Sequence, residues 1–418
     1  MNKARSERML HKLQRKSFDY FVQEYNSTNG LVADSTQHRS IASIAVVGFA
    51  LTAYLVGVER GFLKRSEALK RTLAALRFFS DSHQGTAPNA TGYKGFYYHF
   101  LDMKSGRRAW SCELSTIDTA LWLMGVLAAA RYFNGDRAGE REVRQRSEEL
   151  TGRVNWRWAQ HGATSVSNGW KPERGFLRYR WTGYNEGLLL YIIGLGSAAH
   201  SLPKESYAKW TSTYSWRRIY GHDYLFAGPL FTHQFPHVWI DFRGIQDAFM
   251  RARSIDYFEN SRRATYVQRE YAIRNPRKFK HYSEACWGFT ASLGPGFCTR
   301  KIQGIKRVFR GYCARGVPYG LDDGTIAPWA AVTSLPFAPE IVLPTIERFY
   351  EIEVGLTCKY GFEATFNPTF PSRSNRRYGW ICRWHFGLNQ GALVAMIENY
   401  RSAFLWHLMR TCPDIVRG

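Results

Sequence analysis

Stretches that are apolar all round alternate along this chain with stretches that carry charge on one face only. The apolar residues recur at helical spacing. The expected helices span residues 5–25, 37–58, 64–80, 115–133, 137–152, 186–198, 203–215, 239–254, 257–273, 325–334, 338–350 and 388–410. Helices such as 37–58 and 186–198 are apolar on every side, which is typical of buried helices, whereas 64–80 and 137–152 have a polar face for solvent. A set of six inner and six outer helices predicts an all-α fold, an (α/α)6 toroid. We expect it to form one catalytic domain over residues 1–418.

Residues 41–58 form an uncharged stretch whose length is at the lower limit for a membrane-spanning helix. Polar and small residues interrupt it at Ser43, Gly48, Thr52 and Gly57. We therefore interpret it as a buried inner helix and expect no transmembrane span. The first 40 residues lack the apolar stretch of a signal peptide, so the sequence as written predicts a cytoplasmic protein, or a periplasmic one if a leader precedes it.

The seven cysteines are scattered, odd in number and without a CxxC pair, so neither a zinc knuckle nor a disulfide framework is expected. They are Cys112, Cys286, Cys298, Cys313, Cys358, Cys382 and Cys412. This pattern fits a reducing compartment.

Several acidic residues stand where apolar helices begin. Ser115 and Asp118 form a capping box, so Glu113 lies just before the helix, and Asn185 is a good N-cap that places Glu186 in the first turn of the next inner helix. The inner helices of a toroid run parallel, so we expect these N-termini to converge at one mouth. Two carboxyls among aromatic rings are what glycoside cleavage requires. We expect Glu113 as the general acid and Glu186 as the nucleophile or base. Asp118 is a third catalytic candidate, for which the capping role is favoured.

The same mouth is expected to collect further acids and rings that bind a sugar. The expected substrate-binding residues are Trp170, Tyr184, His233, His237, Trp239, Asp241, Arg243, Trp287, Asp322 and Asp323, with Tyr97, Tyr98 and Trp181 beside them. His233 and His237 have the i, i+4 spacing of metal ligands, but Pro236 argues against a helix there and no acid or cysteine completes a ligand set. We expect no metal and no cofactor.

Long motifs also resemble a known family. They are DSTQHRSIASIAVVGFALTAYLVGVERG (34–61), ELSTIDTALWLMGVLAAARYF (113–133), GYNEGLLLYIIGLGS (183–197), GPLFTHQFPHVWIDFRGIQD (228–247), DYFENSRRAT (256–265), DDGTIAPWAAVTSLPFAPE (322–340) and GLNQGALVAMIENYRS (387–402). In collinear order they resemble the bacterial glycoamylase-like domain family, which includes the endo-β-1,2-glucanases of glycoside hydrolase family 144 and the transglycosylase domain of cyclic β-1,2-glucan synthases. The resemblance implies an (α/α)6 fold, a β-1,2-linked glucan as partner, and catalytic acids at Glu113 and Glu186.

Three positions depart from the family pattern: Leu293 and Asn389 replace Asp, and Ser283 replaces Gly. These departures keep open a glucan-binding protein without catalysis, although both glutamates are retained. Hydrolysis and transglycosylation both remain open, and so does the oligomeric state.

The net charge of +23 raises an alternative of another class, a nucleic-acid-binding protein. Residues 262–280 and 300–315 hold seven and six basic side chains interleaved with Tyr and Phe. No recognised nucleic-acid-binding motif accompanies them, so we expect no specific nucleic-acid partner and attribute the charge to a solvated basic face or an anionic glucan or membrane surface.

Overall fold

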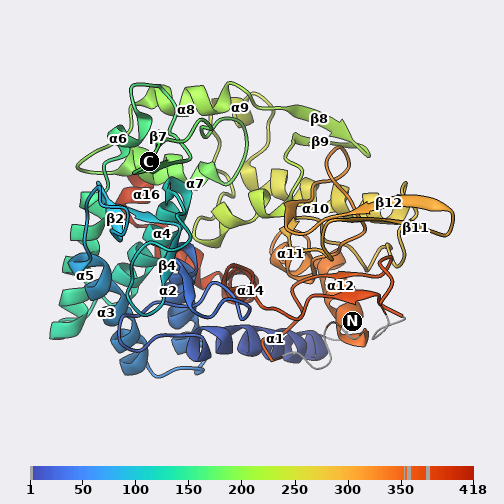
Figure 1. Cartoon of the computed structure of the whole chain (residues 1–418), viewed down its shortest axis with the longest axis horizontal. Coiled ribbons are helices and arrows are strands. Elements are labelled where there is room, and N and C mark those ends of the chain that lie inside the picture. Colours follow the sequence, from blue (N-terminus) through green and yellow to red (C-terminus); the bar gives the residue numbers. More distant parts are fainter. Residues whose placement is uncertain (1–2, 353, 355–358, 373–376) are drawn as a thin grey trace. The chain divides into compact units, whose positions relative to one another are not determined.

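The computed structural model describes residues 3–352, 354, 359–372 and 377–418, and it is mostly helical with small sheets (Figure 1). Cys358 lies outside the described residues; the other six cysteines are free thiols. The chain divides into two compact units, which are described separately below. Unit 1 comprises Met1–Ser17, Ser215–His237 and Asp241–Arg401, and unit 2 comprises Phe18–Tyr214, Val238–Ile240 and Ser402–Gly418.

The helical core of unit 2 is built around two buried helices, α2 (Ile44–Glu59) and α4 (Thr116–Tyr132). They approach so closely that a Cβ atom at Gly125 would overlap the backbone of Gly48. Every α2 residue from Ile44 to Gly57 is buried, which confirms the predicted burial of this helix. The other helices are α3 (Arg65–Asp81), α5 (Ala138–Arg153), α6 (Trp156–Gln160), α7 (Gly187–Gly196), α8 (Lys204–Thr211), α15 (Phe404–Met409) and α16 (Pro413–Arg417). In the described part of the chain, no helix combines the length and hydropathy of a membrane span.

A five-stranded antiparallel sheet in unit 2 positions the residues discussed below. Its order is β2 (Gly92–Tyr93), β3 (Phe96–Tyr98), β5 (Leu114–Ser115), β6 (Gly169–Lys171) and β7 (Gly175–Phe176). Tyr98 pairs with Leu114 and Leu114 with Trp170. A separate pair joins β1 (Ile41–Ser43) to β4 (Phe100–Asp102). These strands are too short to show an alternating pattern in the sequence.

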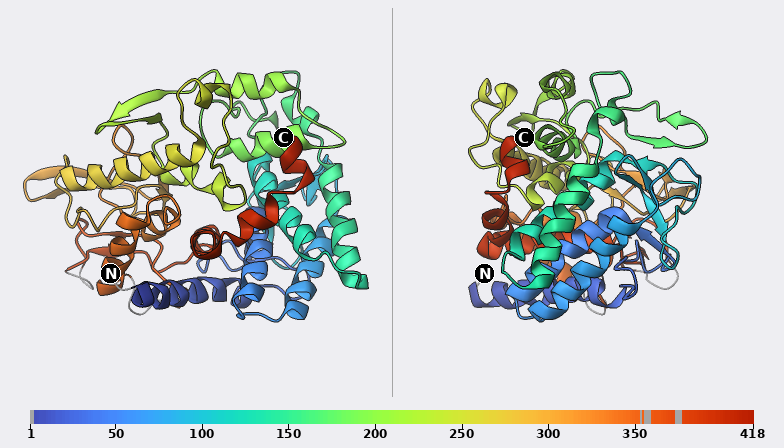
Figure 2. Two further views of the ribbon diagram at one scale, coloured as in Figure 1. Left: turned by 180° about the vertical axis from the view of Figure 1, so that it is seen from behind. Right: turned by 90° about the vertical axis from the view of Figure 1, so that its left-hand side faces the viewer.

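Unit 1 combines helices with hairpins. The long helix α10 (Tyr257–Arg274, yellow in Figure 2) packs against β9 and the 3-10 helix η1. The other helical segments are η1 (Leu230–His233), η2 (Phe235–Val238), α9 (Ala248–Arg251), α11 (Pro328–Thr333), α12 (Pro339–Glu351) and α14 (Gly387–Ser402). The paired strands are β8 (Trp216–Ile219) with β9 (His222–Leu225), β10 (Ala291–Ser292) with β13 (Cys313–Ala314), β11 (Cys298–Ile302) with β12 (Ile305–Phe309), and β14 (Phe366–Asn367) with β15 (Trp380–Ile381). Helix α1 (Lys3–Gln23) contributes residues to both units.

Three predicted helices differ clearly from the structure. The segment 37–58 becomes helical only at Ile44, because Ile41–Ser43 forms strand β1. The segment 239–254 is helical only at its end, in α9, so the prediction that Asp241 opens an inner helix is wrong. Asp241 instead forms an ion pair with Arg243, and Gly244 takes a positive φ of 76° that a helix does not allow. The segment 388–410 is divided at Ala403, whose φ of 54° is left-handed, into α14 and α15.

Candidate active site

The sheet of unit 2 places a histidine beside the first predicted glutamate. His99 follows β3 and Glu113 precedes β5, and the backbone N–H of His99 donates to the carbonyl of Glu113 at 3.0 Å. The side chains also meet: Nδ1 of His99 lies 2.9 Å from Oε1 of Glu113. Its other ring nitrogen, Nε2, lies 3.6 Å from Oδ2 of Asp118. One imidazole therefore bridges two of the predicted acids.

Asp118 belongs to the start of α4. The Oγ of Ser115, the N-cap residue, accepts from the backbone N–H of Asp118 at 3.2 Å and donates to its Oδ2 at 2.5 Å. This confirms the predicted capping interaction. The same carboxylate faces His99, so Asp118 acts on the site through the histidine while it stabilises the helix start.

The charges of this cluster fix the ionisation of Glu113. Burial alone would lower the pKa of His99, but the carboxylates of Asp118, Glu113 and Asp34 raise it to about 9. Burial likewise opposes ionisation of Glu113, yet its hydrogen bond to His99 and the charge of that ring hold the pKa of Glu113 below its ordinary value. At neutral pH, His99 is a cation and Glu113 a carboxylate.

Sequence reasoning missed His99 and Asp34. Burial raises the pKa of Asp34 to about 6, with the charge of Asp118 adding to the effect and that of His99 opposing it. His99 directly follows β3 (Phe96–Tyr98), but its contact with Glu113 depends on the pairing of β3 with β5, which the sequence did not predict.

Glu186 lies at the start of α7, and its pKa is shifted in the opposite direction from that of Glu113. It is the N-cap residue itself, one position earlier than predicted, while Oδ1 of Asn185 accepts from the N–H of Gly187 at 2.9 Å. The side chain is partly buried, and no cation pairs with it among the described residues. Desolvation, assisted by the negative charge of Asp118, raises its pKa to about 7.

Trp181 joins the starts of α4 and α7. Its Nε1 donates to Oγ1 of Thr116, the first residue of α4, at 2.9 Å. Its ring lies 3.4 Å from where a Cβ atom at Gly187, the first residue of α7, would stand. Helices α4 and α7 also contact each other directly. Unit 2 thus brings Glu113, Asp118 and Glu186 into one region.

Two of the predicted sugar-binding rings lie in unit 2 with little or moderate exposure. Trp170 is half-buried on β6, with the rings of Tyr93 and Trp158 at 5.3 and 5.9 Å between centroids. Tyr184 is 8% exposed and packs near Trp210 and Tyr214. Both therefore also contribute to packing.

Three rings expected at the mouth belong to the core of unit 2 instead. Tyr97, Tyr98 and Trp239 have no exposed surface. The indole N–H of Trp239 donates to Oγ1 of Thr52 at 2.9 Å, and its ring packs on Phe49. A residue buried in this way cannot stack on a sugar, so these predictions are wrong.

The two predicted histidines are buried in unit 1. Nε2 of His233 lies 3.1 Å from the carbonyl of Ala227, and Nε2 of His237 lies 3.0 Å from Oγ of Ser261. Burial lowers their pKa values to about 4 and about 3, so both are neutral residues of the core. Among the residues that the structure describes, no cluster of His, Cys, Asp and Glu is suited to a metal ion.

The remaining predicted residues also lie in unit 1. Asp323 forms a buried ion pair with Arg315 at 2.8 Å, and Asp322 accepts from the hydroxyls of Tyr271 and Tyr282 at 2.8 and 2.6 Å. Both carboxylates are thus held by buried partners within unit 1. Trp287 is fully buried as well, which corrects its assignment. Asp241 and Arg243 remain at the surface, paired with each other.

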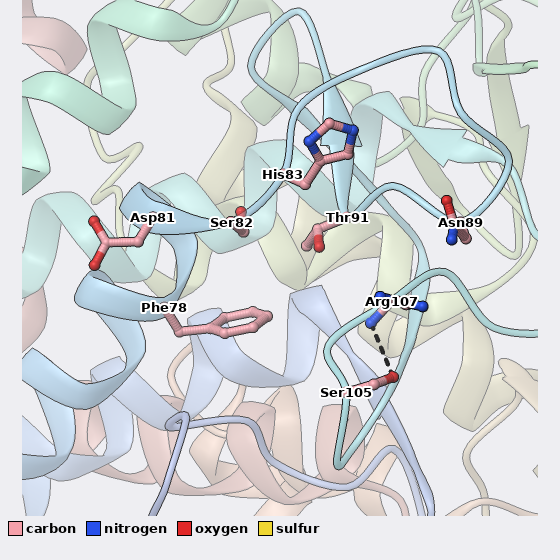
Figure 3. A pocket seen from close by; sticks show the side chains of 8 residues that line it. All are labelled: Phe78, Asp81, Ser82, His83, Asn89, Thr91, Ser105 and Arg107. Carbon is pink, nitrogen blue, oxygen red and sulfur yellow. Dashed lines mark hydrogen bonds between the residues drawn. The ribbon is translucent and has the colours of Figure 1, made fainter.

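A pocket of about 340 Å³ in unit 2 does not contain the acid cluster (Figure 3). Its lining residues are Phe78, Asp81, Ser82, His83, Asn89, Thr91, Ser105 and Arg107. Asp81 is its only carboxyl and pairs with Arg146 at 3.3 Å. A pocket with a single acid lacks the paired carboxyls that glycoside cleavage needs.

Comparison with known proteins gives consistent matches. The model of the Glycoamylase family, described as "Putative glucoamylase", matches residues 178–413. An exo-β-1,2-glucooligosaccharide sophorohydrolase (non-reducing end) of Parabacteroides distasonis is 25% identical over 447 residues; the match covers 99% of this chain, which spans only 57% of that protein. A crystal structure described as a putative glucoamylase, from Bacteroides uniformis, matches with a TM-score of 0.87 and 29% identity over 99% of this chain and 96% of that one. An endo-β-1,2-glucanase of Chitinophaga pinensis, solved with sophorotriose and glucose, matches with a TM-score of 0.86 and 25% identity. The match covers 99% of this chain and 96% of that one.

Proposed function

Because this chain belongs to the Glycoamylase family, we propose that it is a glycoside hydrolase that cleaves β-1,2-linked glucan with Glu113 and Glu186 as its catalytic carboxyls. Support for the substrate comes from the relatives named above that act on β-1,2-linked glucans or glucooligosaccharides. The similarity over nearly the whole chain also supports the finer fold proposal, a single-domain (α/α)6 toroid.

The contact of His99 with Glu113 at 2.9 Å, together with a Glu186 that pairs with no cation among the described residues, is the observation that carries this proposal. Desolvation raises the pKa of Glu186 to about 7, so this carboxyl keeps its proton in mildly acidic solution. His99 lowers the pKa of Glu113 and keeps it ionised. Two carboxyls with separated pKa values are the requirement for acid and base roles in one site. This assigns the general acid to Glu186 and the nucleophile or base to Glu113, the reverse of the sequence-based preference.

The reaction then needs one proton transfer to the leaving group. The carboxyl of Glu186 donates its proton to the glycosidic oxygen as the bond from that oxygen to the anomeric carbon breaks. The carboxylate of Glu113 either attacks the anomeric carbon or takes a proton from the attacking water. His99 and Asp118 are positioning residues, because the histidine holds Glu113 ionised and Asp118 keeps the histidine charged.

The test compares Glu113→Gln and Glu186→Gln with Glu284→Gln, which changes a carboxyl that is 75% exposed in unit 1. The parent should release reducing ends from linear β-1,2-glucan and not from amylose. Each catalytic variant should fold normally and lose at least roughly a hundredfold in rate, while the control keeps its activity. Products longer than the substrate would show glycosyl transfer. Cleavage of amylose alone, or full activity of either catalytic variant, would overturn the proposal.

A further inference from the structure

The loop just before Glu113 contains a strained turn. Trp110 and Ser111 adopt left-handed backbone angles, with φ values of 55° and 47°. Residues other than glycine pay roughly 1–2 kcal/mol each for this conformation. Such strain persists at ligand-binding positions when the surroundings enforce it.

Hydrogen bonds hold this turn from several sides. The guanidinium Nε of Arg108 donates to the carbonyl of Cys112 at 2.6 Å, and the N–H of Cys112 donates to the carbonyl of Ala109 at 3.1 Å. The ammonium group of Lys171, on β6, donates to the carbonyl of Ser111 at 2.9 Å. The turn is therefore a fixed part of unit 2.

The strained turn presents an indole to solvent close to the acid cluster. Trp110 is 56% exposed although it is the largest kind of apolar side chain. Its ring contacts Phe100 with 5.1 Å between centroids, and Phe100 stacks on His99 at 3.8 Å with an interplanar angle of 14°. His99 in turn contacts Glu113 at 2.9 Å. One phenyl ring thus separates the exposed indole from the histidine that holds Glu113.

We propose that the exposed face of Trp110 is the platform on which the glucose unit next to the scissile bond stacks. The C–H faces of a pyranose ring are apolar and flat, and an indole offers a large apolar face with little conformational entropy to lose. Packing with Phe100 and His38 and the fixed turn hold the indole one phenyl ring away from His99, the partner of Glu113. Trp110 nevertheless remains 56% exposed, whereas Trp170 is half-buried between Tyr93 and Trp158. This inference rests on the proposed function, since it needs a glucan substrate.

Binding of sophorotriose to full-length protein carrying Glu186→Gln provides the test, by titration calorimetry. Adding Trp110→Ala should weaken binding about tenfold, the upper end for one aromatic contact, whereas Trp110→Phe should retain most of the affinity. Tyr400→Ala, which removes a ring that is 38% exposed on α14, is the matched control and should change nothing. In the active enzyme, Trp110→Ala should raise KM on linear β-1,2-glucan and leave kcat nearly unchanged.

The outcomes separate the two proposals. If the parent neither binds sophorotriose nor cleaves β-1,2-glucan, the proposed function fails. If the parent does both and Trp110→Ala matches it in affinity and KM, only the platform is refuted. Equal losses for Trp110→Phe and Trp110→Ala would also refute it, because a phenyl ring preserves a stacking face.

Discussion

Replacing Glu186 by Gln should abolish activity and, above neutral pH, make the protein more stable. Burial raises the pKa of Glu186 from its ordinary 4.5 to about 7. The folded state therefore binds this proton more tightly than the unfolded state, and stability is lost as pH rises from 4.5 through about 7. Gln is neutral at every pH, so the variant does not lose this stability.

The size of the effect follows from these two pKa values. Ionisation of Glu186 costs the folded state about 1 kcal/mol at pH 5 and about 3 kcal/mol at pH 8, at 1.36 kcal/mol per pKa unit. The free energy of unfolding of Glu186→Gln relative to the parent should thus improve by roughly 2–3 kcal/mol between these pH values. Any constant effect of the amide cancels in this comparison. If the chain unfolds cooperatively, the Tm difference should grow by about 3 °C.

The assay is thermal and denaturant unfolding of both proteins at pH 5 and pH 8. Glu113→Gln is a control for which the opposite change in stability is expected at high pH. The pKa of Glu113 is lowered, so its ionisation stabilises the fold above the ordinary pKa, and that stability disappears as pH falls through the folded value. Glu113→Gln should therefore be less stable than the parent at pH 8, by a margin that shrinks in acid. A stability difference for Glu186→Gln that stays the same at both pH values would refute the claim that Glu186 is desolvated and neutral.

Further predictions concern the pH profile and the packing. The value of kcat/KM should fall about tenfold per pH unit above pH 7, as Glu186 loses its proton. If the decline on the basic side of the pH profile begins only well above pH 8, Glu186 is excluded as the acid. His99→Gln should move the acidic limb to higher pH, because Glu113 loses its cationic partner; an unchanged limb would contradict this role. Gly125→Ala should destabilise the protein by at least roughly 1–3 kcal/mol in denaturant unfolding, since its Cβ overlaps Gly48. Asp323→Asn should cost about 3–5 kcal/mol, because Arg315 remains as a buried unpaired charge; a loss below 1 kcal/mol would contradict that.

The buried helices and their starts could be predicted from the sequence alone. An uncharged, largely apolar stretch as long as 44–57 is typical of a helix buried on every side, so α2 follows from local composition. Ser115 and Asp118 stabilise the start of α4 through atoms three residues apart, and such local interactions are visible in the sequence. Glu113 and Glu186 could be placed beside helix starts for the same reason.

The tertiary structure decided which side chains meet and in what ionisation state. His99 and Glu113 are 14 positions apart in the chain, and only the pairing of β3 with β5, strands of two and three residues, brings them within hydrogen-bonding distance. That contact makes Glu113 the ionised partner, and burial without a cation makes Glu186 the neutral one. The aromatic and acidic residues Trp239, Trp287, Asp322 and Asp323 could not be separated into core and surface from sequence, because the same side chains suit either place. Burial and ionisation depend on neighbours that are distant in the chain, and these neighbours exist only after folding.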